Sequence, residues 1–175
     1  TQMKNFIYFL LFVFLNTPLS ANNLQISNVS IANQNVAGGY TYVNFNISWE
    51  NSWRDGENYD AAWIFLKYRT NGGSWNHVLL GSTASDHVAP SGANIETPTI
   101  DTGRGVFIYR SSIGSGTNNF QNVQLKWRYQ LNGLASTQYV DVKVFGIEMV
   151  NIPQSAFYAG DGATSNFYGE LTDIS

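Results

Sequence analysis

Val43-Asn44-Phe45-Asn46-Ile47-Ser48-Trp49 decides the fold, because large apolar and small polar residues alternate along it without a break. Such alternation places successive side chains on opposite faces of an extended strand, whereas an amphipathic helix needs a repeat of about 3.6 residues. The same pattern returns in Val123-Gln124-Leu125-Lys126-Trp127-Arg128-Tyr129 and in Val140-Asp141-Val142-Lys143-Val144. These three stretches predict half-buried β-strands, each with one apolar face.

Four further stretches predict strands from less regular patterns. The apolar phase changes between Ile26 and Val29 within residues 24–31, which indicates a β-bulge. Residues 61–69 are apolar on both faces, as is typical of a central strand. Two more strands are expected over 75–80 and 106–109.

Turn signals between these stretches favour antiparallel neighbours. Asn71-Gly72 and Asn132-Gly133 suit two-residue hairpins, since both central positions of such a turn take a positive φ. Residues 81–104 and 111–119 are rich in Gly, Ser, Thr and Asn and are expected to be loops. We therefore predict an all-β fold, an antiparallel β-sandwich of about seven to eight strands, with an open β-barrel as the alternative.

The first residues predict a secretory signal peptide. Met3 is the expected start, Lys4 gives a positive charge, residues 6–15 are apolar, and Ala21 suits the position before a cleavage site. As a helix this apolar run would rise only about 15 Å, half of the roughly 30 Å hydrocarbon core, so a stable membrane span is not expected. An exported protein is predicted, in the periplasm, at the cell surface or secreted.

Composition narrows the class of protein. Hydrophobic residues make up 43% of the chain and charged residues only 12%, so a sizeable core is expected. The chain has no cysteine, which excludes disulfides, thiolate metal sites and a cysteine nucleophile. Its net charge of −3 gives no support for nucleic-acid binding. His77 and His87 belong to no catalytic motif, and catalysis by this chain is not expected.

One acidic stretch is a candidate calcium site. Asp55, Glu57, Asn58 and Asp60 offer oxygen ligands at short spacing, and Gly56 permits a tight turn between them. The pattern is not that of an EF-hand, and a solvated acidic loop is the simpler interpretation. A hydrolase would need two of these carboxylates to face each other across a cleft. No other cofactor is expected.

Two of the five tryptophans are candidates for ligand binding. Trp49 and Trp127 share a face with apolar residues of their strands, so we expect both in the core. Trp53 lies beside the acidic stretch and Trp75 follows a predicted turn, so these two could be exposed. With the acidic stretch they suggest a carbohydrate-binding or adhesive module for cell-surface or environmental glycans, with core packing as the alternative.

The residues near the C-terminus resemble an enzyme family. Met149-Val150-Asn151-Ile152-Pro153-Gln154-Ser155-Ala156-Phe157-Tyr158-Ala159-Gly160 is similar to the start of sulfatase-modifying-factor domains, the formylglycine-generating-enzyme family. That family often opens with Met-Val-x-Ile-Pro-Gly-Gly-x-Phe-x-Met-Gly, so Gln154, Ser155 and Ala159 depart from its pattern. Residues 51–54, 59–68 and 105–110 resemble the β-rich region before that domain in exported proteins of Bacteroidetes-type bacteria.

With the predicted signal peptide over 1–21, this resemblance implies a β-sandwich domain over 22–148 and a linker or truncated second domain over 149–175. The family's copper-binding cysteines, and the clustered histidines of related iron enzymes, match no position here, so no catalytic residue is carried over. The implied function is a non-catalytic accessory module with a structural or interaction role. Its implied partner is the downstream domain of the same polypeptide.

Overall fold

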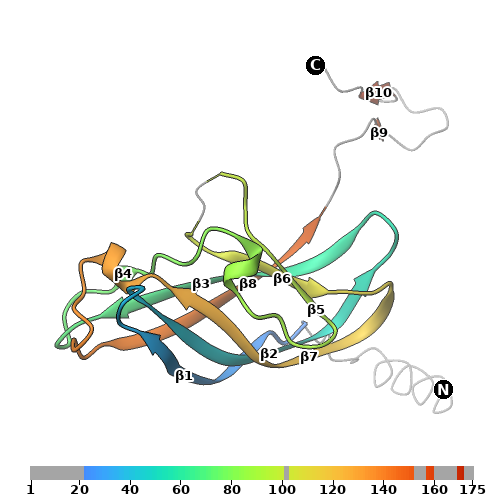
Figure 1. Cartoon of the computed structure of the whole chain (residues 1–175). Helices are drawn as coiled ribbons and strands as arrows, with labels where there is room; N and C mark the ends of the chain where they lie inside the picture. Colours follow the sequence, from blue (N-terminus) through green and yellow to red (C-terminus); the bar gives the residue numbers. More distant parts are fainter. Residues whose placement is uncertain (1–21, 101–102, 152–156, 160–168, 172–175) are drawn as a thin grey trace, which may run out of the picture.

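Figure 1 shows a computed structural model of the chain, which describes residues 22–100, 103–151, 157–159 and 169–171. The predicted signal peptide and most of the segment that resembles sulfatase-modifying factors lie outside these residues. Within them, no helix has both the length and the apolar character needed to cross a membrane.

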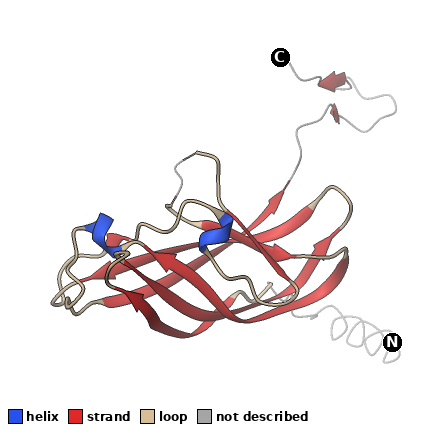
Figure 2. Ribbon diagram, in the orientation of Figure 1, coloured by secondary structure: helices blue, strands red, loops and turns tan. Residues whose placement is uncertain are grey.

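Strands dominate the described residues, and the helices are two short 3-10 turns (Figure 2). The strands are β1 (Gln25–Asn35), β2 (Tyr40–Arg54), β3 (Tyr59–Arg69), β4 (Asn76–His77), β5 (Ala93–Glu96), β6 (Val106–Arg110), β7 (Gly114–Trp127), β8 (Asp141–Asn151), β9 (Phe157–Ala159) and β10 (Gly169–Leu171). The 3-10 turns are η1 (Ala84–Asp86) and η2 (Tyr129–Asn132). The predicted all-β class is confirmed.

The first eight strands form one antiparallel sheet. β2 pairs with β1 and β7, whereas β3 pairs with β8, β6 and β4, and β5 pairs with β6. A hairpin between Arg54 and Tyr59 joins the two groups. The sheet curls into a half-barrel, so that side chains from both groups meet in one core (Figure 1). β9 and β10 form a separate two-stranded sheet.

The core follows the alternation seen in the sequence. Every second residue of β2 from Thr41 to Trp49 is buried, and β3 buries the alternate residues from Asp60 to Tyr68. Trp49 and Trp127 are each 1% exposed, which confirms their predicted place in the core. Burying side chains such as Phe45 stabilises the fold by roughly 1.5–3 kcal/mol each.

Most predicted strands are confirmed. β1 carries the predicted bulge, with a register shift between Ser27 and Ser30 and a φ of 54° at Asn28. β3 has partners along both edges, as expected of a central strand. Asn71 and Gly72 take φ values of 49° and 70°, and their turn joins β3 to β4 as predicted.

Three of the predicted stretches are wrong in part. The strand expected over 75–80 is reduced to β4, and β5 and the first residues of β7 lie in stretches predicted to be loops. Residues 114–118 pair with the end of β2, where most side chains of β7 are exposed. A ladder of backbone hydrogen bonds needs no apolar side chains there, so hydrophobic periodicity could not reveal it.

The predicted hairpin at Asn132-Gly133 is also wrong. η2 ends at this dipeptide, with Gly133 in the left-handed region, and β8 pairs with β3 rather than with β7. The reason is the Asn132 side chain, whose Oδ1 accepts hydrogen bonds from Trp127 Nε1 at 2.8 Å and from the Leu79 N–H at 3.0 Å. These bonds hold the chain as it crosses between the two groups.

β8 continues through Asn151, so the boundary expected between residues 148 and 149 falls inside a strand. Its partner along the whole length is β3, from Asp141 opposite Arg69 to Asn151 opposite Tyr59. The first residues of the family-like segment therefore belong to the main sheet.

Candidate binding surfaces

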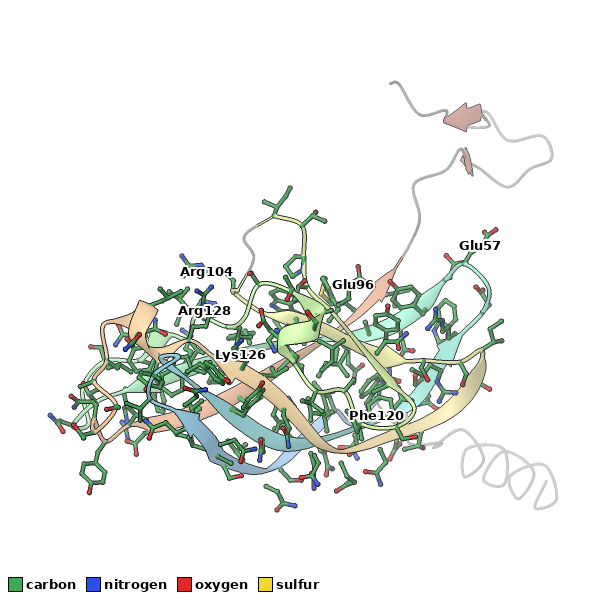
Figure 3. All side chains as sticks on the ribbon, in the orientation of Figure 1. Glu57, Glu96, Arg104, Phe120, Lys126 and Arg128 are labelled. Carbon is green, nitrogen blue, oxygen red and sulfur yellow. The ribbon has the colours of Figure 1, made fainter. Side chains whose placement is uncertain are left out.

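Asp55 stabilises the β2–β3 hairpin. Its Oδ1 accepts the backbone N–H groups of Glu57 at 2.7 Å and Asn58 at 2.6 Å, and these hydrogen bonds lower the pKa of its carboxyl. Glu57 lies at the tip of this hairpin, well away from Lys126 and Arg128 (Figure 3).

Asp60, a second predicted calcium ligand, is buried. It accepts hydrogen bonds from Trp49 Nε1 at 2.5 Å, from Ser52 Oγ at 2.8 Å and from the Trp53 N–H at 2.8 Å. The Asp60 carboxylate therefore accepts hydrogen bonds inside the protein, whereas the Glu57 side chain is exposed to solvent. In the described part of the chain, no three His, Cys, Asp or Glu side chains are placed to hold a metal ion. The structure thus does not gather the predicted calcium ligands.

A polar network that the sequence did not reveal surrounds Asp60. Ser52 Oγ also accepts Asn118 Nδ2 at 2.7 Å, and the Arg110 guanidinium donates to Asn118 Oδ1 at 3.1 Å and to the Gly116 carbonyl at 3.2 Å. Ser52 is 0% exposed and Asn118 is 3% exposed. The network satisfies buried polar groups where β2, β6 and β7 meet, which makes it structural.

Trp53 and Trp75 lie at opposite ends of β3. Trp53 is half-buried just before the β2–β3 hairpin, and Trp75 is half-buried just after the turn that follows β3. Because a strand rises about 3.3 Å per residue, the two ends of β3 are roughly 30 Å apart. The structure therefore does not bring the two predicted ligand-binding tryptophans into one site.

Trp75 borders an open groove between β1 and β8. The Arg69 guanidinium lies 4.8 Å and the Lys143 ammonium 4.9 Å from the centre of its ring, and Arg69 Nε is 2.8 Å from Asp141 Oδ2. The groove encloses about 510 Å³ and is lined by Val29, Ser30, Ile31, Arg69, Trp75, Val140, Asp141, Val142 and Lys143. We call it the seam groove.

The outer surface of β3, β6 and β8 is rich in large apolar residues. At its centre, large side chains of neighbouring strands lie next to one another. We call this group of residues the apolar face: Trp63, Phe65, Phe107, Phe145, Ile147 and Met149. Phe65 and Phe145 stack with ring centres 5.2 Å apart, and Trp63 and Phe107 lie 4.7 Å apart. Ile147 is 54% exposed and Met149 is 44% exposed.

A second groove, of about 450 Å³, lies on the apolar face. Trp63, Phe107, Ile147 and Met149 line it together with Pro98, Ile100 and Arg104. The Trp63 indole lies directly over Gly105, where any Cβ would collide with the ring. Gly105 therefore leaves the space that the Trp63 indole, the largest side chain on this face, occupies.

Aromatic rings also gather near the hairpin end of β3. Tyr59 and Tyr109 stack with ring centres 4.3 Å apart, and the Arg54 guanidinium lies 5.4 Å and 5.2 Å from them. Burial, with a hydrogen bond to Glu96, raises the pKa of Tyr109 to about 12. The two tyrosines and Arg54 therefore form an aromatic and cationic cluster at the hairpin end of the outer surface.

His87 is a buried histidine, and both of its ring nitrogens form hydrogen bonds. Its Nδ1 accepts the Lys126 N–H at 3.2 Å, so the proton resides on Nε2, which donates to the Gly81 carbonyl at 3.2 Å. Burial is the largest cause that lowers the pKa of His87. Beside it, Lys126 and Asp86 form a salt bridge of 2.7 Å.

Comparison of the chain with known protein families, with curated proteins and with solved structures gave no match. The likeness to the sulfatase-modifying factors therefore rests on the residues quoted above.

Proposed function

We propose that this chain is a non-catalytic exported module that binds another protein domain through its apolar face. The observation that carries the proposal is the ladder formed by Trp63, Phe107 and Ile147 with their neighbours. Exposed single apolar residues are common on proteins, but contiguous apolar patches mark interaction sites. Aromatic residues and Met are also enriched at protein interfaces.

The position of the face supports the downstream domain of the same polypeptide as the partner. Ile147 and Met149 belong to β8, the strand that leads into the segment resembling a sulfatase-modifying-factor domain. A domain that follows β8 would be tethered beside the apolar face. Tethering raises the effective concentration of a partner to about the millimolar range, so modest apolar contacts would suffice.

Oxidative footprinting tests this proposal. If the reading frame continues beyond Ser175, the longer polypeptide and the present chain are exposed to hydroxyl radicals and compared. We expect Met149 and Trp63 to be oxidised several-fold more slowly in the longer polypeptide, because the partner covers them. Tyr139, which is 89% exposed and off the apolar face, is the internal control and should react equally in both.

Two results would contradict the proposal. One is an in-frame stop directly after Ser175, and the other is equal oxidation of Met149 in both polypeptides. Ile147→Ser is the matched variant, and it should restore the oxidation of Met149 in the longer polypeptide. Ile113→Ser, at a residue that is 71% exposed and off the apolar face, should leave the protection intact.

Carbohydrate binding is the second candidate function, favoured by the half-buried indole of Trp75 in an open groove. A glycan array probed with the chain tests it, with Trp75→Ala as the variant and Trp53→Ala as the comparison. Binding that survives in Trp75→Ala would remove this candidate.

We also propose that the curled sheet is a β-sandwich, in which β1, β2 and β7 form one layer and β8, β3, β6 and β5 form the other. Support comes from the position of the core between these groups and from β1 and β8, each paired on one side only in the described residues.

A further inference from the structure

The seam groove lies between two strand edges. β1 pairs only with β2 and β8 only with β3 among the described residues, so the groove is bordered by an edge at 29–31 and an edge at 140–143. An edge strand presents unpaired backbone N–H and C=O groups, which can pair with a further strand. The groove therefore offers backbone pairing as well as side-chain contacts.

The two edges differ in regularity. The register of β1 against β2 shifts between Ser27 and Ser30 and again between Ala32 and Asn35. β8 pairs with β3 without a shift from Asp141 to Asn151. Bulges protect an edge against added strands, so β8 is the edge suited to pairing where the groove opens, at residues 141–143. Further along β8, the side chains of Leu24 and Ile26 lie against Gly146, so β1 lies close beside that part of the edge.

The rim of the groove is cationic. Lys67 and Lys143 are directly opposite each other in the β3–β8 register, an arrangement of like charges that costs stability. Arg69 is matched by Asp141, and the Trp75 ring contacts both Arg69 and Lys143. Of the charged residues that line the groove, Arg69 and Lys143 are cations and Asp141 is a carboxylate, and Lys67 adds a positive charge next to Lys143. In a chain with a net charge of −3, this excess of positive charge favours a ligand with negative charge.

We propose that the seam groove binds an extended acidic segment of another protein, which adds to the sheet as a strand along the edge of β8. Side chains of an added strand alternate between its two faces. One set would contact Val140 and Val142, which pack against the core, and the other set would meet Lys143. In the added strand, an acidic residue opposite Lys143 is favoured, whereas a second acidic residue two positions away would lie opposite Asp141 and be repelled. This difference sets the register of the added strand against β8.

Calorimetric titration of the full chain with capped peptides tests this inference. In the parent peptide valine alternates with threonine, and a glutamate replaces the central threonine. We expect this peptide to bind and its lysine counterpart to bind about tenfold more weakly, since one charge contact changes sign. Two N-methylated versions of the parent peptide test backbone pairing separately from charge. Each carries methyl groups on alternate backbone nitrogens, one version on the odd and the other on the even positions. Only one of these two sets of N–H groups in an added strand faces the edge of β8. One version should bind like the parent, and the other should bind at least about tenfold more weakly.

Variants locate the site. Lys143→Gln should weaken binding of the glutamate peptide by about threefold or more, while Arg128→Gln, which removes an exposed cation just beyond β7, should not. Circular dichroism of each variant establishes that the fold is retained.

Equal binding of the glutamate and lysine peptides, or of the two N-methylated versions, would overturn the inference. Binding of polygalacturonate without binding of any peptide would overturn it in favour of an acidic polysaccharide. The apolar face takes no part in these measurements, so they succeed or fail independently of the proposed docking.

Discussion

The carboxylate of Asp60 lies 2.5 Å from the indole nitrogen of Trp49, and this hydrogen bond joins the start of β3 to a buried residue of β2. Ser52 and the Trp53 N–H donate to the other oxygen of the same carboxylate. A charged acceptor with three donors forms stronger hydrogen bonds than a neutral one. The residue that looked like a calcium ligand thus fixes the hairpin between the two halves of the sheet.

Asp60→Asn should therefore destabilise the protein by about 2–3 kcal/mol, because an amide nitrogen replaces one acceptor and faces a donor. Urea unfolding followed by tryptophan fluorescence measures the loss. Glu57→Gln, at the exposed tip of the same hairpin, should change the free energy of unfolding by less than about 0.5 kcal/mol. A similarly small change in Asp60→Asn would show that the charge is dispensable.

Stability should fall as the pH drops below about 6.5, the ordinary pKa of histidine. The pKa of His87 is lowered in the folded protein, chiefly by burial, so the unfolded chain takes up a proton before the folded chain does. The slope contributed by one such group is at most about 1.4 kcal/mol per pH unit, and it ends below the folded pKa.

Urea unfolding at pH 8, 6.5 and 5.5 measures this slope. His87→Gln removes the titrating group and should flatten the profile between pH 6.5 and 5.5. Asp86, whose carboxylate borders His87, titrates at lower pH because hydrogen bonds from Lys126 and Thr83 outweigh its burial and lower its pKa. An unaltered slope in the variant would mean that His87 is not responsible.

Asn132→Ala should cost about 2–4 kcal/mol, because it leaves the Trp127 indole N–H and the Leu79 N–H without their acceptor. Leu131→Ala, at an exposed residue of the same η2 turn, is the control and should change the free energy of unfolding by less than about 1 kcal/mol. Thermal unfolding of both variants gives the comparison, and an equal loss would contradict this account of η2.

Gly105→Ala should displace the Trp63 indole from the sheet. The added methyl group would meet the ring and, at 2.8 Å, the Ile64 carbonyl oxygen, so the side chain must move. We expect a change in Trp63 fluorescence and a loss of roughly 1–3 kcal/mol from overpacking. Gly56→Ala, where no atom lies near the new methyl group, is the control. Unchanged fluorescence in Gly105→Ala would place the indole elsewhere.

The alternation of β2, β7 and β8 was readable in the sequence because each has one face against the core and one outside. The strand at residues 114–118 could not be predicted from the sequence, because its pairing with β2 depends on backbone groups that every residue has. Asn132-Gly133 misled for a different reason: a hairpin signal is local, whereas the partner of Asn132 is the distant Leu79.

The candidate surfaces were predictable only in part. Trp53 and Trp75 are both half-buried, and the contacts of Trp75 with Arg69 and Lys143 arise from pairing between β3 and β8, which the sequence does not reveal. The apolar face was hidden, because Trp63 and Phe65 lie in a stretch that is apolar on both sides and reads as a buried strand. Only the three-dimensional structure shows that none of the described elements packs over this side of β3.

The two long ladders of the sheet join residues from opposite ends of the domain, Thr41 with Trp127 and Tyr59 with Asn151. The β2–β7 ladder closes only when the chain up to Trp127 is available and the β3–β8 ladder only when the chain up to Asn151 is available, and the β2–β3 hairpin joins the two groups of strands. Loop closure must precede most of the stabilising contacts, so we expect refolding on the scale of milliseconds to seconds and a single cooperative transition. A nascent chain that stops short of β8 would expose β3 along one edge, where it is prone to association with other chains.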